Sequence, residues 1–130
     1  MKKLLTSLLL VQSFSNTFAY SKLDECLNVN QEDKTRIFKI LREGEWTQFK
    51  WDGHFSGSFH DRRDGFIHMA TLDKLEYVIS KYFSDIPIHI VEFSEDSYQD
   101  SIRWENGFPH VYGDSLRIED IVNVYRCIEE

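Results

Sequence analysis

The chain has few cysteines, no run of lysines or arginines, and no internal repeat or low-complexity segment. Its 15 basic residues are outnumbered by 22 acidic ones, which gives a formal net charge of −7. Because non-specific binding to nucleic acid requires a basic surface, this balance disfavours double-stranded nucleic acid as a partner. A length of 130 residues allows one domain at most.

Common catalytic signatures are also missing. The histidines do not stand at the spacing of a zinc-binding helix, such as His-Glu-x-x-His, so a metal site is not predicted. The serines lie outside any Gly-x-Ser-x-Gly nucleophile elbow, which disfavours a nucleophilic triad. The two cysteines are too far apart in the chain for a zinc ribbon or a redox Cys-x-x-Cys motif.

The N-terminal apolar segment, residues 4–11, is too short to span a bilayer, which takes about 20 residues. It follows Lys2 and Lys3 and precedes Thr17-Phe18-Ala19, which has small residues three and one before a cleavage point. This pattern predicts a secretory signal peptide over residues 1–19, and the alternative is a helix on a membrane surface. The prediction implies an exported protein, periplasmic or secreted, with no stable membrane span after cleavage.

Cleavage would leave Cys26 and Cys127 near opposite ends of the mature chain. In an oxidising compartment such an isolated pair is a candidate disulfide. The bond would close a loop of about 100 residues and stabilise the fold by about 4 to 5 kcal/mol. The alternative is two unconnected buried thiols.

The residues that are abundant predict a small α+β domain. A hydrophobic fraction of 42% with 15% aromatic residues suits a globular core. Pattern and composition predict strands over 35–41, 66–70, 88–93, 102–105 and 121–128, of which 88–93 is expected to be central. They also predict a helix over 42–50 that ends at Gly53, and a second helix capped by Thr71. The apolar stripe of the second helix, which includes Tyr82, is predicted to be core. Loops or turns are predicted over 54–65, which ends in the turn signal Asp64-Gly65, and over 94–101, 108–113 and 116–120. A further turn is predicted at Asn106-Gly107. The domain covers residues 35–130, after an N-terminal arm over residues 20–34 that includes one helical turn.

Polar and aromatic side chains cluster in several of these segments. A helix N-terminus and an arginine bind phosphate, while aromatic rings stack on flat groups. The cluster therefore predicts a site for a flat, negatively charged ligand, formed by His68, Thr71, Arg103, Trp104, Glu105, His110 and Tyr112. The structural alternative is that His68 is a satisfied core histidine and that Arg103 and Glu105 simply pair with each other.

The same segments resemble a bacterial family, the domain of unknown function 952, from Ile37 to about Val124. The matching segments are Ile37-Phe38-Lys39-Ile40, Trp46, Gly57-Ser58, Asp61, Asp64-Gly65-Phe66-Ile67-His68, Thr71, Arg103-Trp104-Glu105 and Phe108-Pro109-His110-Val111-Tyr112-Gly113. One departure is Ala70, where members of the family usually have serine. The signal peptide and the arm lie outside the resemblance.

This resemblance implies a fold similar to ADP-ribosyltransferases, with a split core of two small, mostly antiparallel sheets, two short helices and a nucleotide cleft. His68 would bind ligand or act in acid–base catalysis, and Glu105 would stabilise developing positive charge. Thr71 would bond the ligand and Arg103 would hold phosphate. The implied cofactor is NAD or a related nucleotide, and the implied reaction is ribosyl or phosphate transfer. The alternative is a non-enzymatic periplasmic or secreted binding module.

Overall fold

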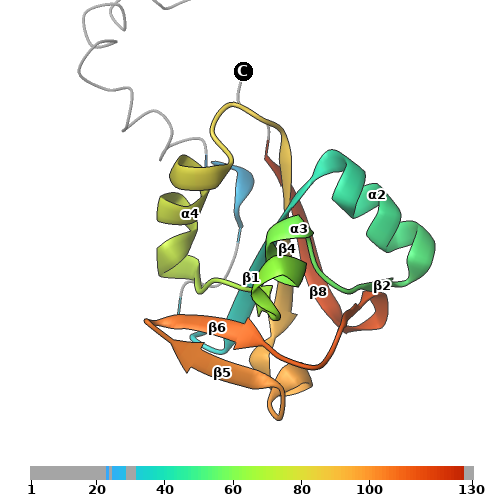
Figure 1. Ribbon diagram of the computed structural model, residues 1–130. Coiled ribbons are helices and arrows are strands. Elements are labelled where there is room, and N and C mark those ends of the chain that lie inside the picture. The colour runs from blue at the N-terminus through green and yellow to red at the C-terminus, as the bar shows by residue number, and fades with distance from the viewer. Residues whose placement is uncertain (1–22, 24, 29–31, 128–130) are drawn as a thin grey trace, which may run out of the picture.

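The computed structural model describes residues 23, 25–28 and 32–127 (Figure 1). The expected signal peptide and much of the arm lie outside the described residues. The fold is α+β, as predicted, but the described residues form three small antiparallel sheets where the family resemblance implies two. Within the described part of the chain, no helix is both long and apolar enough to cross a membrane.

The largest sheet has the strand order β1-β4-β8, formed by β1 (Arg36–Arg42), β4 (Ile88–Ser94) and β8 (Ile121–Cys127). The central position of β4 confirms the prediction from its apolar residues on both faces. Successive residues of β1 point to opposite faces, so Ile37 and Leu41 enter one core while Phe38 and Ile40 enter another.

Helices cover both faces of this sheet (Figure 1). On one side, α2 (Glu43–Asp52) buries Phe49 in the first core and ends at Gly53, as predicted. On the other side, α4 (Leu75–Tyr82) buries Leu75 in the second core. The exposed fraction of Tyr82 is 55%, so the prediction that this residue is core is wrong.

Thr71 precedes a 3-10 turn, η3 (Leu72–Lys74), and α4 follows only after it. Thr71 is the N-cap residue of this turn, but its hydroxyl donates to the Asp73 carboxylate at 2.6 Å and accepts no capping hydrogen bond from the turn. The sequence therefore predicts the start of this helical segment at Thr71 correctly, although the Thr71 side chain does not cap it.

Residues 54–65 are not the predicted loop, because they contain β2 (His54–Phe55) and α3 (Phe59–Asp64). The Ser58 side chain accepts from the Asp61 amide, and the Asp61 carboxylate accepts from the Ser58 amide, which is the reciprocal capping box that starts a helix. Gly65 adopts φ 87° and ends α3, so the Asp-Gly signal marks a helix terminus.

The sheet nearest the site has the order β3-β6-β5, from β3 (Ile67–His68), β6 (Phe108–Val111) and β5 (Ile102–Glu105). Asn106 and Gly107 join β5 to β6 with φ values of 53° and 84°, as the Asn-Gly turn signal predicts. The prediction of a loop over residues 108–113 is wrong for residues 108–111, because these form β6, the middle strand of this sheet.

The remaining segments are short. β2 pairs with β7 (Leu116–Arg117) to form the second sheet. The 3-10 turns η4 (Glu95–Tyr98) and η5 (Ile118–Asp120) lie within the segments predicted as a loop and a turn. They bring the buried Tyr98 within hydrogen-bond distance of Asp120, at 2.9 Å.

The structure contains the predicted disulfide between Cys26 and Cys127, with the two Cα atoms 5.6 Å apart. The bond joins a helical turn of the arm, in which the Leu27 amide donates to the Leu23 carbonyl, to the end of β8. Leu23 and Leu27 pack against the second core. The disulfide therefore attaches apolar residues of the arm to the domain.

His89 on β4 gives a testable pH effect. Its exposed fraction is 7%, its Nδ1 has no hydrogen-bond partner among the described residues, and Glu43 Oε1 lies 3.5 Å away. Burial lowers the pKa of His89 below 6.5, although Glu43 opposes this shift. The folded state therefore takes up this proton less readily than the unfolded state, so stability is full above about pH 6.5 and falls as the pH drops below it.

We expect His89→Phe to raise the free energy of unfolding by about 1 kcal/mol at neutral pH, because it removes an unpaired buried nitrogen. The variant keeps a ring beside Trp46, which contacts His89 with ring centroids 5.7 Å apart. It should also lose less stability than the wild type below pH 6.5, as measured by urea unfolding across the pH range. If the free energy of unfolding of the variant fell as steeply below pH 6.5 as that of the wild type, His89 would not be the source of this pH dependence.

Candidate functional site

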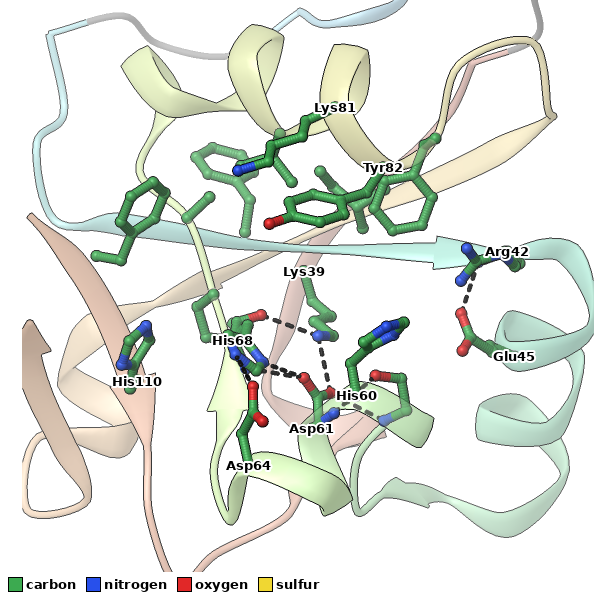
Figure 2. Close-up of a pocket in the computed structure, with 18 of the residues that line it drawn as sticks. Lys39, Arg42, Glu45, His60, Asp61, Asp64, His68, Lys81, Tyr82 and His110 are labelled. Carbon is green, nitrogen blue, oxygen red and sulfur yellow. Dashed lines mark hydrogen bonds and ion pairs between the residues drawn. The ribbon is translucent and has the colours of Figure 1, made fainter. Parts of the chain in front are cut away.

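A pocket of about 480 Å³ lies over β1, between the α3–β3 segment and α4 (Figure 2). Figure 2 shows Lys81 and Tyr82 on the α4 wall, and His60, Asp61, Asp64 and His68 on the opposite wall. His110 lies at one end of the pocket, while Arg42 and Glu45 lie at the other. The other lining residues are Phe38, Lys39, Ile40, Ser58, Arg63, Met69, Ala70, Tyr77, Val78, Phe83 and Phe108.

An ion pair forms the floor of the pocket. Lys39 shares the face of β1 that carries Ile37 and Leu41, so its ammonium group is buried beneath the site. Lys39 Nζ lies 2.8 Å from Asp61 Oδ2 and donates to the His68 carbonyl at 2.9 Å. The side chains of Lys39 and Asp61 are only 7% and 2% exposed. A charge buried to this extent requires a partner, and each of these residues provides one for the other.

The Asp61 carboxylate accepts hydrogen bonds on both oxygens. Oδ1 accepts from the His68 amide at 3.1 Å and from His68 Nδ1 at 2.7 Å. Oδ2 accepts from the Ser58 amide at 2.8 Å and from Lys39. Burial acts to raise the pKa of Asp61, but the His68 bond and the Lys39 charge outweigh it and hold the pKa well below its usual range. Burial lowers the pKa of Lys39, against the opposing effect of Asp61.

The His68 imidazole is fixed between two carboxylates. Its Nδ1 contacts Asp61, and its Nε2 lies 3.0 Å from Asp64 Oδ2 at the rim of the pocket. Carboxylates only accept hydrogen bonds, so this geometry suits a ring that donates from both nitrogens. With 39% of its side chain exposed, His68 can reach a ligand while Asp61 fixes its orientation. This arrangement suits anion binding or proton transfer.

His110 lies directly opposite His68 in the β3–β6 register, and the two ring centroids are 5.3 Å apart. Its Nδ1 lies 2.6 Å from Glu105 Oε1, which also accepts from the Tyr112 hydroxyl at 2.8 Å. The hydrogen bonds from His110 and Tyr112 lower the pKa of Glu105. Phe66 stacks on His110 with centroids 4.2 Å apart, so the position of His110 is fixed by both polar and aromatic contacts.

The structure brings together only part of the residue set predicted from the sequence. His68 and His110 line the pocket, whereas Glu105 is bonded to His110 and Tyr112 is bonded to Glu105 without either joining the lining. Arg103 lies over the Tyr112 ring, with Cζ 4.3 Å from the centroid.

Thr71 and Trp104 also lie outside the lining. The Thr71 hydroxyl is bonded to Asp73. Trp104 pairs with Pro109, whereas Arg103 pairs with His110. Since neighbouring residues of a strand point to opposite faces, Trp104 lies on the face of the sheet opposite His110.

Several lining residues were not predicted from the sequence. Two signals could have found the floor of the pocket: a lysine at the centre of an apolar strand, and the Ser58-x-x-Asp61 capping pattern. Tyr82 was assigned to the core, so the α4 wall was missed. The other unpredicted polar or charged residues are Arg42, Glu45, His60, Asp64, Tyr77 and Lys81.

The electrostatics of the pocket differ from those of the whole chain. Four lysines and arginines and three acidic residues line it, which gives 4 − 3 = +1 before its three histidines are counted. The full chain carries −7. Aromatic side chains lie in the same lining, so the pocket combines positive charge with flat apolar surface. In the described part of the chain, no group of three or more histidine, cysteine or acidic residues is arranged to hold a metal ion.

Three solved structures of one bacterial protein are similar to this chain. The crystal structure of protein CC0527 from Caulobacter crescentus has 28% sequence identity and a TM-score of 0.67, over 71% of this chain and 85% of that chain. A crystal structure of its double mutant gives the same values. Its solution NMR structure has 29% identity and a TM-score of 0.60, over 69% of this chain and 82% of that chain.

No curated protein matches the sequence significantly. The family model described as protein of unknown function DUF952 matches residues 40–124, which include the end of β1, most of the pocket lining and the β3-β6-β5 sheet. The resemblance seen in the sequence motifs is thereby confirmed at the level of the family, and the chain belongs to the DUF952 family.

Proposed function

We propose that the pocket binds a nucleotide or a similar phosphorylated ligand. The observation that carries the proposal is the division of the lining between its two walls. Cationic and histidine side chains lie on the α3–β3 side, while tyrosines and a lysine lie on the α4 side. A volume of about 480 Å³ lies within the range typical of small-molecule sites.

The phosphate would bind at the α3–β3 wall. Arg63 offers a planar guanidinium group that matches phosphate oxygens, and His68 offers Nε2 at the rim. His60 is exposed on the same wall. These groups come from one short segment of chain, so Asp61 positions them together by holding α3 and β3.

The flat part of the ligand would lie against the aromatic side chains. Tyr77 and Tyr82 are 54% and 55% exposed, a large fraction for tyrosines that line a pocket. Lys81 Nζ lies 3.2 Å from the Tyr77 hydroxyl and 5.3 Å from the Tyr82 ring centroid, so a positive charge adjoins this surface. Aromatic rings with a nearby cation suit a base that carries phosphate.

The finer part of the proposal is an ADP-ribosyltransferase-like cleft that takes NAD or a related nucleotide. The position of His68 on a short strand beside the pocket supports it, as does the division of the strands into small separate sheets. If ribosyl or phosphate transfer takes place, His68 is the group placed to exchange a proton with the ligand. Glu105 would then act by positioning His110, because its carboxylate is bonded to His110 and Tyr112.

Export from the cytosol belongs to the same proposal. The Cys26–Cys127 disulfide supports it, because such bonds persist in oxidising compartments. The ligand would then be encountered in the periplasm or outside the cell.

The proposal predicts that His68→Ala weakens the binding of NAD, ADP-ribose or adenosine monophosphate, whichever of these the wild type binds. The expected loss is tenfold or more, about 1.4 kcal/mol, because the variant lacks a charged or polar contact to phosphate. Isothermal titration calorimetry measures the affinity of each compound.

His54→Ala is the matched control, since His54 is exposed on β2 and does not line the pocket. It should bind as the wild type does. No heat with any of the three compounds would overturn the proposed function. A lower melting temperature of His68→Ala, with no change in ligand binding, would instead assign His68 a structural role in a non-enzymatic domain.

A further inference from the structure

Two carboxylates contact His68, but their surroundings differ. Asp61 is 2% exposed and accepts hydrogen bonds on both of its oxygens from groups of the protein interior. The Asp64 side chain is 30% exposed at the rim of the pocket, on the last residue of α3. Asp61 is therefore a permanent part of the floor, whereas Asp64 can leave its position without uncovering a buried charge.

Nitrogen donors from two residues converge on the Asp64 carboxylate. Arg63 Nε lies 2.9 Å from Oδ1, and Arg63 Nη2 lies 3.3 Å from Oδ2. His68 Nε2 approaches Oδ2 at 3.0 Å. The bond to Arg63, followed by the charges of Arg63 and His68, lowers the pKa of Asp64, so the carboxylate is held as an anion.

The same donors would suit a phosphate. A guanidinium group and an imidazole nitrogen that converge on one anion form a common phosphate-binding arrangement. The carboxylate is held by solvent-exposed contacts, which stabilise its position only weakly. A phosphate that carries two negative charges can therefore compete for these donors.

We propose that the Asp64 carboxylate occupies the phosphate subsite when no ligand is bound, and that a phosphate group displaces it to bind Arg63 and His68 Nε2. This inference rests on the proposed function and adds the position of the phosphate within the pocket. It also makes Asp64 a determinant of affinity, because the ligand must compete with a carboxylate of the protein itself. A neutral ligand part, such as a nucleoside, does not take part in this competition.

The test compares Asp64→Asn with the wild type in NMR titrations with inorganic phosphate, adenosine monophosphate and adenosine, following the His68 and Arg63 side-chain signals. We expect the variant to bind the two phosphorylated probes about fivefold more tightly, because the site no longer has an internal anion to exclude. Adenosine binding should stay unchanged. Asp64 is exposed, so the variant should give the spectrum of a folded protein.

Asp100→Asn is the matched control, because it removes the same charge from an exposed residue outside the pocket lining. The titrations are repeated at about 0.1 M and about 1 M salt, between which the screening length falls from about 10 Å to about 3 Å. Direct competition predicts that the ratio of the variant and wild-type affinities persists at high salt. A general charge effect predicts that the ratio approaches one.

The outcomes separate this inference from the proposed function. Phosphate binding by Asp64→Asn that is equal to or weaker than that of the wild type overturns the displacement and leaves the proposed function standing. A tightening that Asp100→Asn reproduces, or that disappears at high salt, also overturns the displacement. If no phosphorylated probe binds to either protein, the proposed function fails and the displacement fails with it.

Discussion

Replacing Asp61 with asparagine is expected to lower the free energy of unfolding by about 3 to 5 kcal/mol. Every polar contact of the Asp61 carboxylate is an N–H donor, from Lys39, Ser58 or His68. An amide has one oxygen, and its NH₂ group would face two of these donors. The buried ammonium of Lys39 would also lose the charge that balances it. Urea unfolding at neutral pH measures the difference.

Asp100→Asn again provides a control, because it changes an exposed aspartate and should alter stability very little. Lys39→Met should destabilise as well, since it leaves Asp61 charged and buried. The two substitutions combined should cost less than the sum of the separate effects, because each removes the same ion pair. Additive effects, or a change below about 1 kcal/mol for Asp61→Asn, would contradict the role of this pair.

The effect of Asp61 should depend on pH. Its pKa is lower in the folded than in the unfolded state, because the His68 bond and the Lys39 charge outweigh burial. The stability from this group is therefore complete above the unfolded pKa, near 3.9, and is lost as the pH falls toward the folded value. The difference between the wild type and Asp61→Asn should accordingly narrow below about pH 4.

Reduction of the Cys26–Cys127 disulfide is expected to cost about 4 to 5 kcal/mol of stability. The two cysteines are 101 residues apart, so the bond removes much of the freedom of the unfolded chain. Its loss would also release the helical turn that holds Leu23 and Leu27 against the second core. Urea unfolding with and without a reductant measures this contribution.

The Cys26→Ser and Cys127→Ser double variant provides the matched control. It should unfold at the same urea concentration with or without reductant, and that concentration should equal the value for the reduced wild type. A wild-type midpoint that does not respond to complete reduction would show that the disulfide contributes little to stability.

The parts of the fold that follow from local patterns were predicted correctly. β4 is buried on both faces and is apolar throughout most of its length, so its central position could be inferred from composition. The turn at Asn106 and Gly107 follows from the ability of these residues to adopt positive φ. Neither inference requires knowledge of a distant part of the chain.

The errors arise where a distant contact decides the structure. Pro109 suggests a loop or an edge strand, yet β6 lies between β5 and β3. In β6, only His110 and Val111 pair with β3, so Pro109 lies beyond the paired residues. At that point Pro109 needs no amide hydrogen, because its carbonyl accepts a hydrogen bond from the Met69 amide. Residues 59–64 look like a polar turn, but the capping box and the bond from Lys39 to Asp61 hold them as a helix.

The candidate site was predicted in part for the same reason. His68 and His110 could be selected because histidine suits ligand chemistry, and they do lie opposite each other. Local patterns mark Lys39 and Asp61 separately, but their ion pair depends on how β1 and α3 pack together, which no local pattern specifies. Arg103 and Glu105 were selected by residue type, but the structure uses them to support Tyr112 and His110.

The turn at Asn106 and Gly107 has a consequence for the pocket, although neither residue lines it. The turn sets the register in which Arg103 faces His110, and β3 then places His68 opposite the same residue. One additional residue in this turn would shift β6 by one position and exchange its two faces. His110 would then point to the core and a neighbouring apolar side chain to the pocket. The length of a surface turn thus determines which side chains the ligand would meet.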